Sequence, residues 1–291
     1  MTSTSDHTTV LPTTFQSWRG LLTHLGIRPS KGMGQNFLLD RDVVREIVDA
    51  AEIDRGTTVV EIGPGLGIMT EELLTRAGRV IAVELDSRLA KHLRNLFGDR
   101  VNFELIEADA LQVEFEELVA PNERYQIVAN LPYSVAAAIT RHALEDPLPP
   151  TRMTVMVQKE VAERMAASPP NMSILGVATQ FYATARIVFI VPADVFFPRP
   201  EVESAVVELV PRADRPLPAS GEVLFFRLVT AGFRQKRKQI ANSLSSELGL
   251  AKDRIQRLLL AAGIESSRRA ETISVDEWVR LTLIGSEELL P

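Results

Sequence analysis

Short apolar runs rich in β-branched residues alternate with segments of helical period over the first two thirds of the chain. Such runs predict buried strands, which we expect at 57–62, 79–83, 101–106, 126–129, 153–158, 186–191 and 204–210. Helices are expected to begin at residues 15 and 40, and to span residues 135–144, 160–166 and 174–182. Alternation of this kind indicates a parallel sheet covered on both faces. The last two strands are joined through 192–200 without a helix, so they should pair antiparallel.

Beyond residue 211 only helical periods appear. The proline-containing segment 212–221 reads as a linker, and Ser274 with Glu277 forms a capping box that opens the last helix. We therefore predict an α/β domain at 15–211 and a small all-helical domain at 212–291. Residues 1–14 are rich in Ser and Thr without apolar periodicity, and are expected to be a disordered tail.

Composition excludes several kinds of site. The chain has no cysteine, which removes disulfides and zinc–thiolate sites, and its four histidines show no metal spacing. No apolar run reaches the ~18 residues needed to cross a bilayer. The net charge is −6, but residues 1–209 hold 19 Lys and Arg against 28 Asp and Glu, whereas residues 210–291 hold 13 against 10. The densest basic cluster, at Arg234, Lys236, Arg237 and Lys238, is a candidate phosphate contact on one helix; a solvated helix face is the alternative.

A glycine-rich turn follows the strand at 57–62. Glycines at 63, 65 and 67 let a ligand approach the backbone, because no Cβ intrudes. Ile68 stands where a dinucleotide fingerprint has its third glycine, which disfavours a pyrophosphate ligand. Glu84 ends the next strand, where a carboxylate is placed to accept ribose hydroxyls, and Asp109 after the third strand could accept from an adenine amino group. The set suits S-adenosylmethionine, although a tight turn and two solvated acids remain possible.

The sequence Asn130-Leu131-Pro132-Tyr133 follows the strand at 126–129. The amide oxygen of Asn130 and the carbonyl of Leu131, held out by Pro132, can accept both hydrogens of a flat amino group. Tyr133 can stack on the ring that carries this group, as expected for enzymes that act on an extruded base. A plain strand-to-turn exit is the alternative, since Asn and Pro are common in turns.

Seven motifs occur together and in order: GQNFL at 34–38, VEIGPG at 60–65, VELD at 83–86, NLPY at 130–133, QKEV at 158–161, FFPRPEVESAVV at 196–207 and FRQKRKQIANSL at 233–244. Together they resemble the bacterial 16S rRNA adenine dimethyltransferases, the KsgA/RsmA family, from about residue 15 to the C-terminus. The resemblance implies a Rossmann-like class I methyltransferase sheet, mostly parallel with its last strand antiparallel, and a small helical C-terminal domain. It also implies transfer of two methyl groups to N6 of each of two adjacent adenines near the 3′ end of 16S rRNA.

The resemblance also assigns residues. It implies that Phe196 packs on the base opposite Tyr133, although a core aromatic flanked by prolines is the alternative. The residues implied to hold S-adenosylmethionine are Gln35, Asn36, Leu38, Glu61, Gly63, Gly65, Glu84, Leu85, Asp109, Ala110 and Asn130.

The expected partner is 16S rRNA in the small ribosomal subunit or its precursor, in the cytoplasm, with no membrane or metal and with the enzyme as a monomer. Two departures are visible: Ser134 stands where the family more often has Asn, and the chain is acidic. The alternatives are a 23S rRNA adenine methyltransferase that confers antibiotic resistance and a non-catalytic assembly or nucleic-acid-binding factor on the same fold. The FRQKRKQIANSL segment favours the small-subunit enzyme.

Overall fold

The computed structural model describes residues 11–12, 14–27 and 36–289, and the chain divides into two compact units. Unit 1 comprises residues 1–159 and 188–208, and unit 2 comprises 160–187 and 209–291. Strands β7 and β9 run from one unit into the other. The predicted boundary at 211/212 follows a different criterion, the loss of strand signals, so the division at 15–211 and 212–291 stays a prediction.

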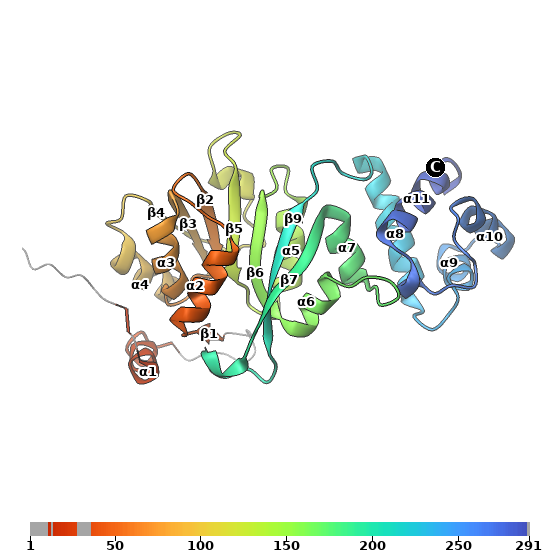
Figure 1. The fold of residues 1–291 in the computed structure, drawn as a ribbon. Coiled ribbons are helices and arrows are strands. Elements are labelled where there is room, and N and C mark those ends of the chain that lie inside the picture. The colour runs from red at the N-terminus through yellow and green to blue at the C-terminus, as the bar shows by residue number, and fades with distance from the viewer. Residues whose placement is uncertain (1–10, 13, 28–35, 290–291) are drawn as a thin grey trace, which may run out of the picture. The chain divides into compact units, whose positions relative to one another are not determined.

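Unit 1 holds the predicted alternation of strands and helices (Figure 1). Its elements are α1 Phe15–His24, β1 Phe37–Leu38, α2 Arg41–Ala50, β2 Thr58–Ile62, α3 Ile68–Arg76, β3 Arg79–Glu84, α4 Ser87–Phe97, β4 Phe103–Glu107, η2 Phe115–Leu118, β5 Tyr125–Asn130, α5 Ala136–Glu145, β6 Arg152–Gln158, η3 Ala193–Val195 and β8 Phe196–Phe197, with parts of β7 Ala183–Val191 and β9 Ser204–Pro211. Every strand predicted from a β-branched run is present, with ends shifted by up to three residues.

The sheet has the strand order β4-β3-β2-β5-β6-β9-β7. Strands β4, β3, β2, β5 and β6 pair parallel, and the antiparallel strands come last in the chain, as predicted. All five side chains of β2 are buried, which is expected for a parallel strand with helices on both faces. Paired residues of neighbouring strands, such as Val59 of β2 and Val80 of β3, join one apolar cluster with α1 to α4. Because β2, β3 and β5 pair parallel, their carboxyl ends meet at one edge of the sheet.

A second, two-stranded sheet was not predicted. Strand β1 pairs antiparallel with β8, so that Phe37 lies opposite Phe197 and Leu38 opposite Phe196. The backbone N–H of Leu39 extends this pairing by donating to the Val195 carbonyl at 3.0 Å. The pair joins segments about 160 residues apart in the chain and fixes the N-terminal segment beside the main sheet.

Unit 2 contains α6 Lys159–Met165 from residue 160, α7 Ile174–Tyr182, α8 Ala219–Arg234, α9 Ile240–Leu248, α10 Lys252–Ala261, η4 Ala270–Thr272 and α11 Val275–Leu289. Helix α8 packs against α11 through Gly232, where an added Cβ would lie 2.5 Å from the ring of Trp278. The capping box is confirmed: the Ser274 N–H donates to Glu277 at 2.8 Å, and the Glu277 N–H donates to the Ser274 hydroxyl at 3.2 Å. Among the described residues, no helix combines the length and apolar character needed to cross a membrane.

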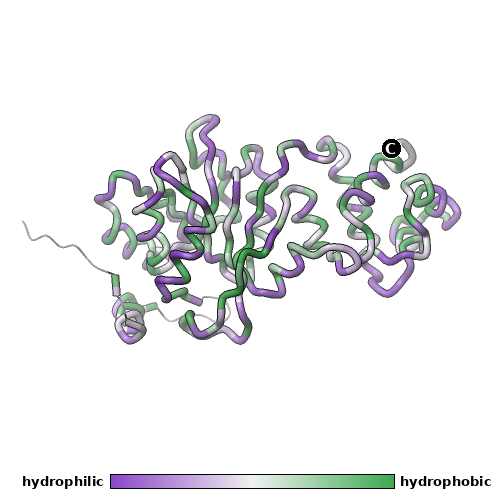
Figure 2. Tube along the Cα trace, in the orientation of Figure 1, coloured by the Kyte–Doolittle hydropathy of each residue, from purple (hydrophilic) through white to green (hydrophobic). Residues whose placement is uncertain are grey.

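The basic cluster does not lie on one helix, which corrects the prediction. Helix α8 ends at Arg234, and Lys236, Arg237 and Lys238 lie in the turn before α9. Gln235 leaves helical geometry with φ −120° and ψ 69°, and the N–H of Ile240 donates to the Arg268 carbonyl. Figure 2 shows the turn between α8 and α9 as a hydrophilic stretch.

Candidate active site

The glycine turn joins β2 to α3 at the carboxyl edge of the sheet. Gly67 adopts φ +85°, and an added Cβ would lie 2.8 Å from Phe97 and 2.9 Å from Leu93 of α4. This third glycine therefore allows α4 to pack against the turn. Gly65, at φ +59°, directs its N–H to the Glu84 carboxylate at 3.1 Å. The turn is thus joined to the end of β3 through a side chain.

Glu84 is a buried carboxylate with two backbone donors. Its oxygens accept from the N–H of Gly65 at 3.1 Å and from the N–H of Asp86 at 2.9 Å. Burial raises the pKa of Glu84, and these two hydrogen bonds act in the opposite direction. Each oxygen keeps a lone pair for another donor, which is what two ribose hydroxyls require.

Glu61 is a fully buried carboxylate without a hydrogen-bond partner at either oxygen. Burial raises its pKa to about 8; the charge of Glu84 adds to this rise, and the nearby Thr70 hydroxyl opposes it. A buried carboxyl group that lacks partners is costly unless a ligand completes it. Because Glu61 lines a cavity, a ligand with positive charge fits this position.

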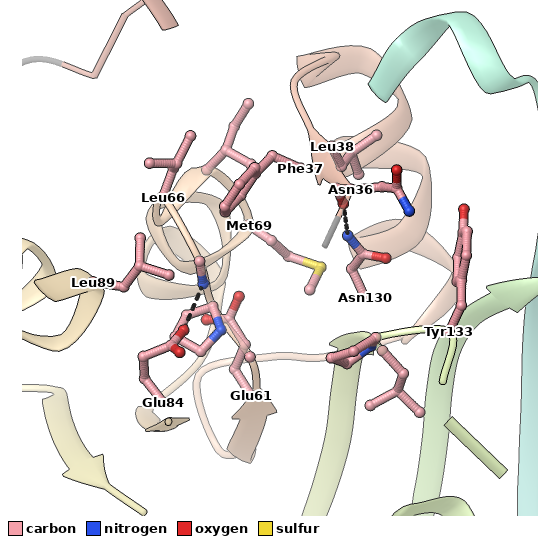
Figure 3. A pocket seen from close by; sticks show the side chains of 16 residues that line it. Asn36, Phe37, Leu38, Glu61, Leu66, Met69, Glu84, Leu89, Asn130 and Tyr133 are labelled. Atoms are coloured by element: carbon pink, nitrogen blue, oxygen red, sulfur yellow. Dashed lines mark hydrogen bonds between the residues drawn. The ribbon is translucent and has the colours of Figure 1, made fainter. Parts of the chain in front are cut away.

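Two cavities that share Gly63, Glu84 and Pro132 lie along this edge, with volumes of about 100 Å³ and about 490 Å³. The first is drawn in Figure 3. Of the predicted donor-binding residues, those lining the first cavity are Asn36, Leu38, Glu61, Gly63, Gly65, Glu84 and Asn130, and those lining the second are Gly63, Glu84, Leu85, Asp109 and Ala110. Gln35 lies outside the described residues. The sequence did not indicate Phe37, Leu66 or Met69, which form an apolar part of the first cavity.

The tetrapeptide at 130–133 lines the first cavity beside the glycine turn. The Asn130 amide nitrogen donates to the Asn36 carbonyl at 3.3 Å, as the dashed line in Figure 3 shows. This bond orients the amide and leaves Oδ1 as its acceptor atom. Tyr133 lies on the side of Asn130 away from Met69 (Figure 3). Its hydroxyl is 2.6 Å from the hydroxyl of Ser204.

The structure does not bring Phe196 to this cavity. The side chain is only 1% exposed and belongs to the apolar cluster of unit 1. Its neighbour Phe197 is half-buried, with the Arg19 guanidinium 5.4 Å from its ring centre. Pairing of β8 with β1 explains the difference, because successive side chains of a strand point to opposite faces. Phe196 is therefore a core side chain in this structure, and its contact with a base stays a prediction.

The four residues of the basic cluster, Arg234, Lys236, Arg237 and Lys238, are all exposed in unit 2. Arg234 pairs with Glu247 at 3.3 Å. Within the described part of the chain, no salt bridge is formed by Lys236, Arg237 or Lys238. Among all the residues that the structure describes, no three or more His, Asp or Glu side chains form a group that could hold a metal ion.

Comparison with known proteins identifies the family. The model of the ribosomal RNA adenine dimethylase family matches residues 28–285. The chain belongs to this family. Ribosomal RNA small subunit methyltransferase A of Dehalococcoides mccartyi is 44% identical over 257 residues, which are 88% of each chain. The chain is therefore a methyltransferase that uses S-adenosylmethionine.

Two solved structures share the fold of this chain. The 23S rRNA methyltransferase ErmE is 30% identical with a TM-score of 0.68, over 85% of this chain and 98% of the other. A dimethyladenosine transferase from Plasmodium falciparum is 24% identical with a TM-score of 0.74, over 85% and 96%, and supports the fold. The predicted Rossmann-like sheet followed by a helical region is therefore confirmed.

The residues at this edge fit the donor that the dimethylase family uses. When bound, S-adenosylmethionine supplies a methyl group activated by an adjacent sulfonium. Glu61 places a carboxyl group without a protein partner beside the first cavity, where a cationic ligand would favour its ionised form, and Glu84 offers acceptor oxygens where the two cavities meet. An activated methyl group requires no enzyme nucleophile, so the protein's contribution is alignment and electrostatics.

Proposed function

We propose that this dimethylase methylates N6 of two adjacent adenines near the 3′ end of 16S rRNA, twice each, during small-subunit assembly in the cytoplasm. The observation that carries the proposal is the Asn130 amide, which the Asn36 carbonyl orients at the wall of the donor cavity. Relatives named as small-subunit methyltransferases support the choice of rRNA. The enzyme acts as a monomer in this proposal.

The target amine needs activation by geometry. Its lone pair is delocalised into the adenine ring, and acceptors for its two hydrogens favour the pyramidal form in which the lone pair is free. Asn130 Oδ1 and the Leu131 carbonyl are these acceptors, and Pro132 holds the Leu131 carbonyl outward. Tyr133 stacks on the extruded base, and Phe196 reaches its other face only if its side chain leaves the core. The amine loses its proton after transfer, when it has become acidic, so no strong base is needed.

The donor lies along both cavities in this proposal. Its adenine amino group is accepted by Asp109 beside Leu85 and Ala110, and its ribose by Glu84. The amino-acid end lies in the first cavity near Glu61, under Asn36 and Leu38. The glycines at 63 and 65 let this end approach the backbone closely.

The test is mass spectrometry of rRNA from cells that lack the gene. Small-subunit rRNA should lose N6,N6-dimethyladenine at two adjacent positions, and the wild-type gene should restore both. The Asn130→Ala variant should restore neither, although the protein accumulates. Unchanged small-subunit rRNA in the deletion strain would contradict the proposal.

A second candidate is methylation of large-subunit rRNA, which the likeness to a 23S rRNA methyltransferase favours. The same experiment separates the two, because loss of a methylated adenine from 23S rRNA alone would select this alternative. A non-catalytic assembly factor is not retained, because the chain belongs to a family of methyltransferases.

RNA is held partly by the turn between α8 and α9 in this proposal. Neutralising Lys236, Arg237 and Lys238 should weaken binding to the small subunit and lower the salt slope by about 0.7 to 0.9 per lost phosphate contact. A matched control neutralises Arg227, Lys252 and Arg257, which are also exposed in unit 2. Salt titrations that are identical for the two triple variants would leave the turn as a solvated surface.

A further inference from the structure

The far end of the Tyr133 side chain is held by β9. The phenol oxygen lies 2.6 Å from Oγ of Ser204, the first residue of β9 and a fully buried side chain. Tyr133 itself is half-buried and lines the first cavity. In Figure 3 its ring stands beside Asn36 and Asn130.

Ser204 is in turn fixed by its neighbour in the chain. The carbonyl of Glu203 accepts from the N–H of Lys159 at 3.0 Å, and its carboxylate pairs with the Lys159 ammonium at 2.8 Å. Lys159 directly follows β6, which pairs with β5, the strand that ends in Asn130. These contacts connect the QKEV motif at 158–161 with the start of β9.

Holding both ends of a tyrosine fixes the plane of its ring. Tyr133 lies in the turn after β5, which is held by the bond from the Val135 N–H to the Pro132 carbonyl at 3.1 Å. A fixed phenol oxygen therefore leaves little freedom in the two side-chain torsions. A base stacked on this ring takes its orientation from the ring plane. The transfer requires the base amine to meet Asn130 Oδ1 and the methyl group together, and small misplacements are costly in such reactions. Burial also raises the pKa of the Tyr133 phenol, which keeps it neutral.

We infer that Ser204 is a positioning residue for methyl transfer: its hydroxyl fixes the plane of the Tyr133 ring and thereby of the adenine stacked on it. The Lys159–Glu203 pair holds Ser204 in place. This inference rests on the proposed function, because it takes adenine as the group that stacks on Tyr133.

The test is a double-mutant cycle with small subunits from the deletion strain as substrate. Tyr133→Phe, Ser204→Ala and the double variant are compared with wild type in kcat, in KM for the subunit and in donor affinity by calorimetry. Each single change should lower kcat about three- to ten-fold, the range for one lost hydrogen bond. The double variant should be no slower than either single variant, because both remove the same bond. Donor affinity should be unchanged.

Ser243→Ala is the matched control. Ser243 is also a fully buried serine, and its hydroxyl donates to the Ala231 carbonyl at 2.7 Å in unit 2. This variant should lower thermal stability and leave kcat as in wild type, which separates positioning from a general loss of stability.

Wild-type kcat in the single variants, or effects that multiply in the double variant, would overturn the role of Ser204. If Ser204→Ala fails to fold, Tyr133→Phe alone decides, because it keeps the stacking ring and removes only the hydroxyl. Full kcat in Tyr133→Phe rejects the inference. Failure of the proposed function is distinguishable, since wild-type enzyme would then leave the small subunits unmethylated.

Discussion

Glu61 and Glu123 lie at opposite ends of the parallel strands of unit 1 and differ in their hydrogen-bond partners. Glu61, near the carboxyl end of β2, is fully buried without a hydrogen-bond partner. Glu123, just before β5, accepts from the Thr58 hydroxyl, the Ala120 N–H and the Arg79 guanidinium. The pKa of Glu61 rises to about 8 through burial, whereas the pKa of Glu123 is lowered, chiefly by the Thr58 hydroxyl.

The same contrast holds for asparagine. Asn102, at the amino end before β4, donates to the carbonyls of Leu74 and Ala77 and joins the end of α3 to the sheet. Asn130, at the carboxyl end of β5, makes one bond that leaves its acceptor oxygen for a ligand. Polar groups at the amino end therefore stabilise the fold, whereas those at the carboxyl end keep acceptor oxygens without a protein partner, which the proposed donor and base would use.

Asn130→Ala gives the largest expected effect at the carboxyl end. Methyl transfer should fall by about 100-fold or more, because the bond to the amine strengthens as the transition state forms. Donor affinity, measured by calorimetry, should stay close to wild type. Asn102→Ala is the control and should cost stability without slowing transfer. Equal kcat in the two variants would remove the functional distinction between the two ends.

Glu84→Ala should weaken donor binding by roughly 1.5–3 kcal/mol, the scale for hydrogen bonds to a charged group. The physical reason is the loss of both ribose acceptors where the cavities meet. Calorimetric titration with S-adenosylmethionine measures the change, and circular dichroism checks the fold. Unchanged affinity in a folded variant would exclude Glu84 from the donor site.

Glu61 should make the donor-free enzyme less stable as pH rises. Its folded-state pKa of about 8 lies above the ordinary value of 4.5, so the folded chain holds a proton that the unfolded chain has lost. This contribution is fully present below pH 4.5 and is lost as pH rises to about 8, with a slope of at most about 1.4 kcal/mol per pH unit. Urea denaturation between pH 5 and 8 should show a flatter dependence for Glu61→Gln. Parallel curves would show that burial does not perturb this carboxyl.

The amino end should show the smallest effect. Thr58→Val removes the hydroxyl that bonds Glu123 and keeps a β-branched side chain, so it should cost about 1 kcal/mol of unfolding free energy. Methyl transfer and donor affinity should match wild type. A change in kcat larger than the change in stability would contradict the separation of the two ends.

Local patterns sufficed for much of this fold. The β-branched run at 57–62 and the glycines after it predicted β2 and its turn, since both features depend on neighbouring residues. The capping box at Ser274 was predictable for the same reason. Glu84 and Asp109 were found because parallel strands bring successive strand ends to one edge.

Long-range contacts were beyond the sequence patterns. Strands β1 and β8 have two residues each, too few to show a period of two. The bond from Asn130 to Asn36 and the bond from Tyr133 to Ser204 join residues 94 and 71 positions apart. The sequence at 234–238 consists of good helix formers. The helix is nevertheless interrupted there, and the Ile240 N–H at the start of α9 donates to the Arg268 carbonyl.

The pairing of Phe37–Leu38 with Phe196–Phe197 sets the order of events in synthesis. Ribosomes make the N-terminal strand first, but its partner emerges only after some 160 further residues. Contacts of such sequence separation form late, because a long loop must close before they are gained. The wall of the cavity formed by Asn36, Phe37 and Leu38 is therefore completed only when β8 has left the exit tunnel. In the proposed donor site, a nascent chain shorter than this lacks the β1–β8 pairing that holds one wall of the cavity.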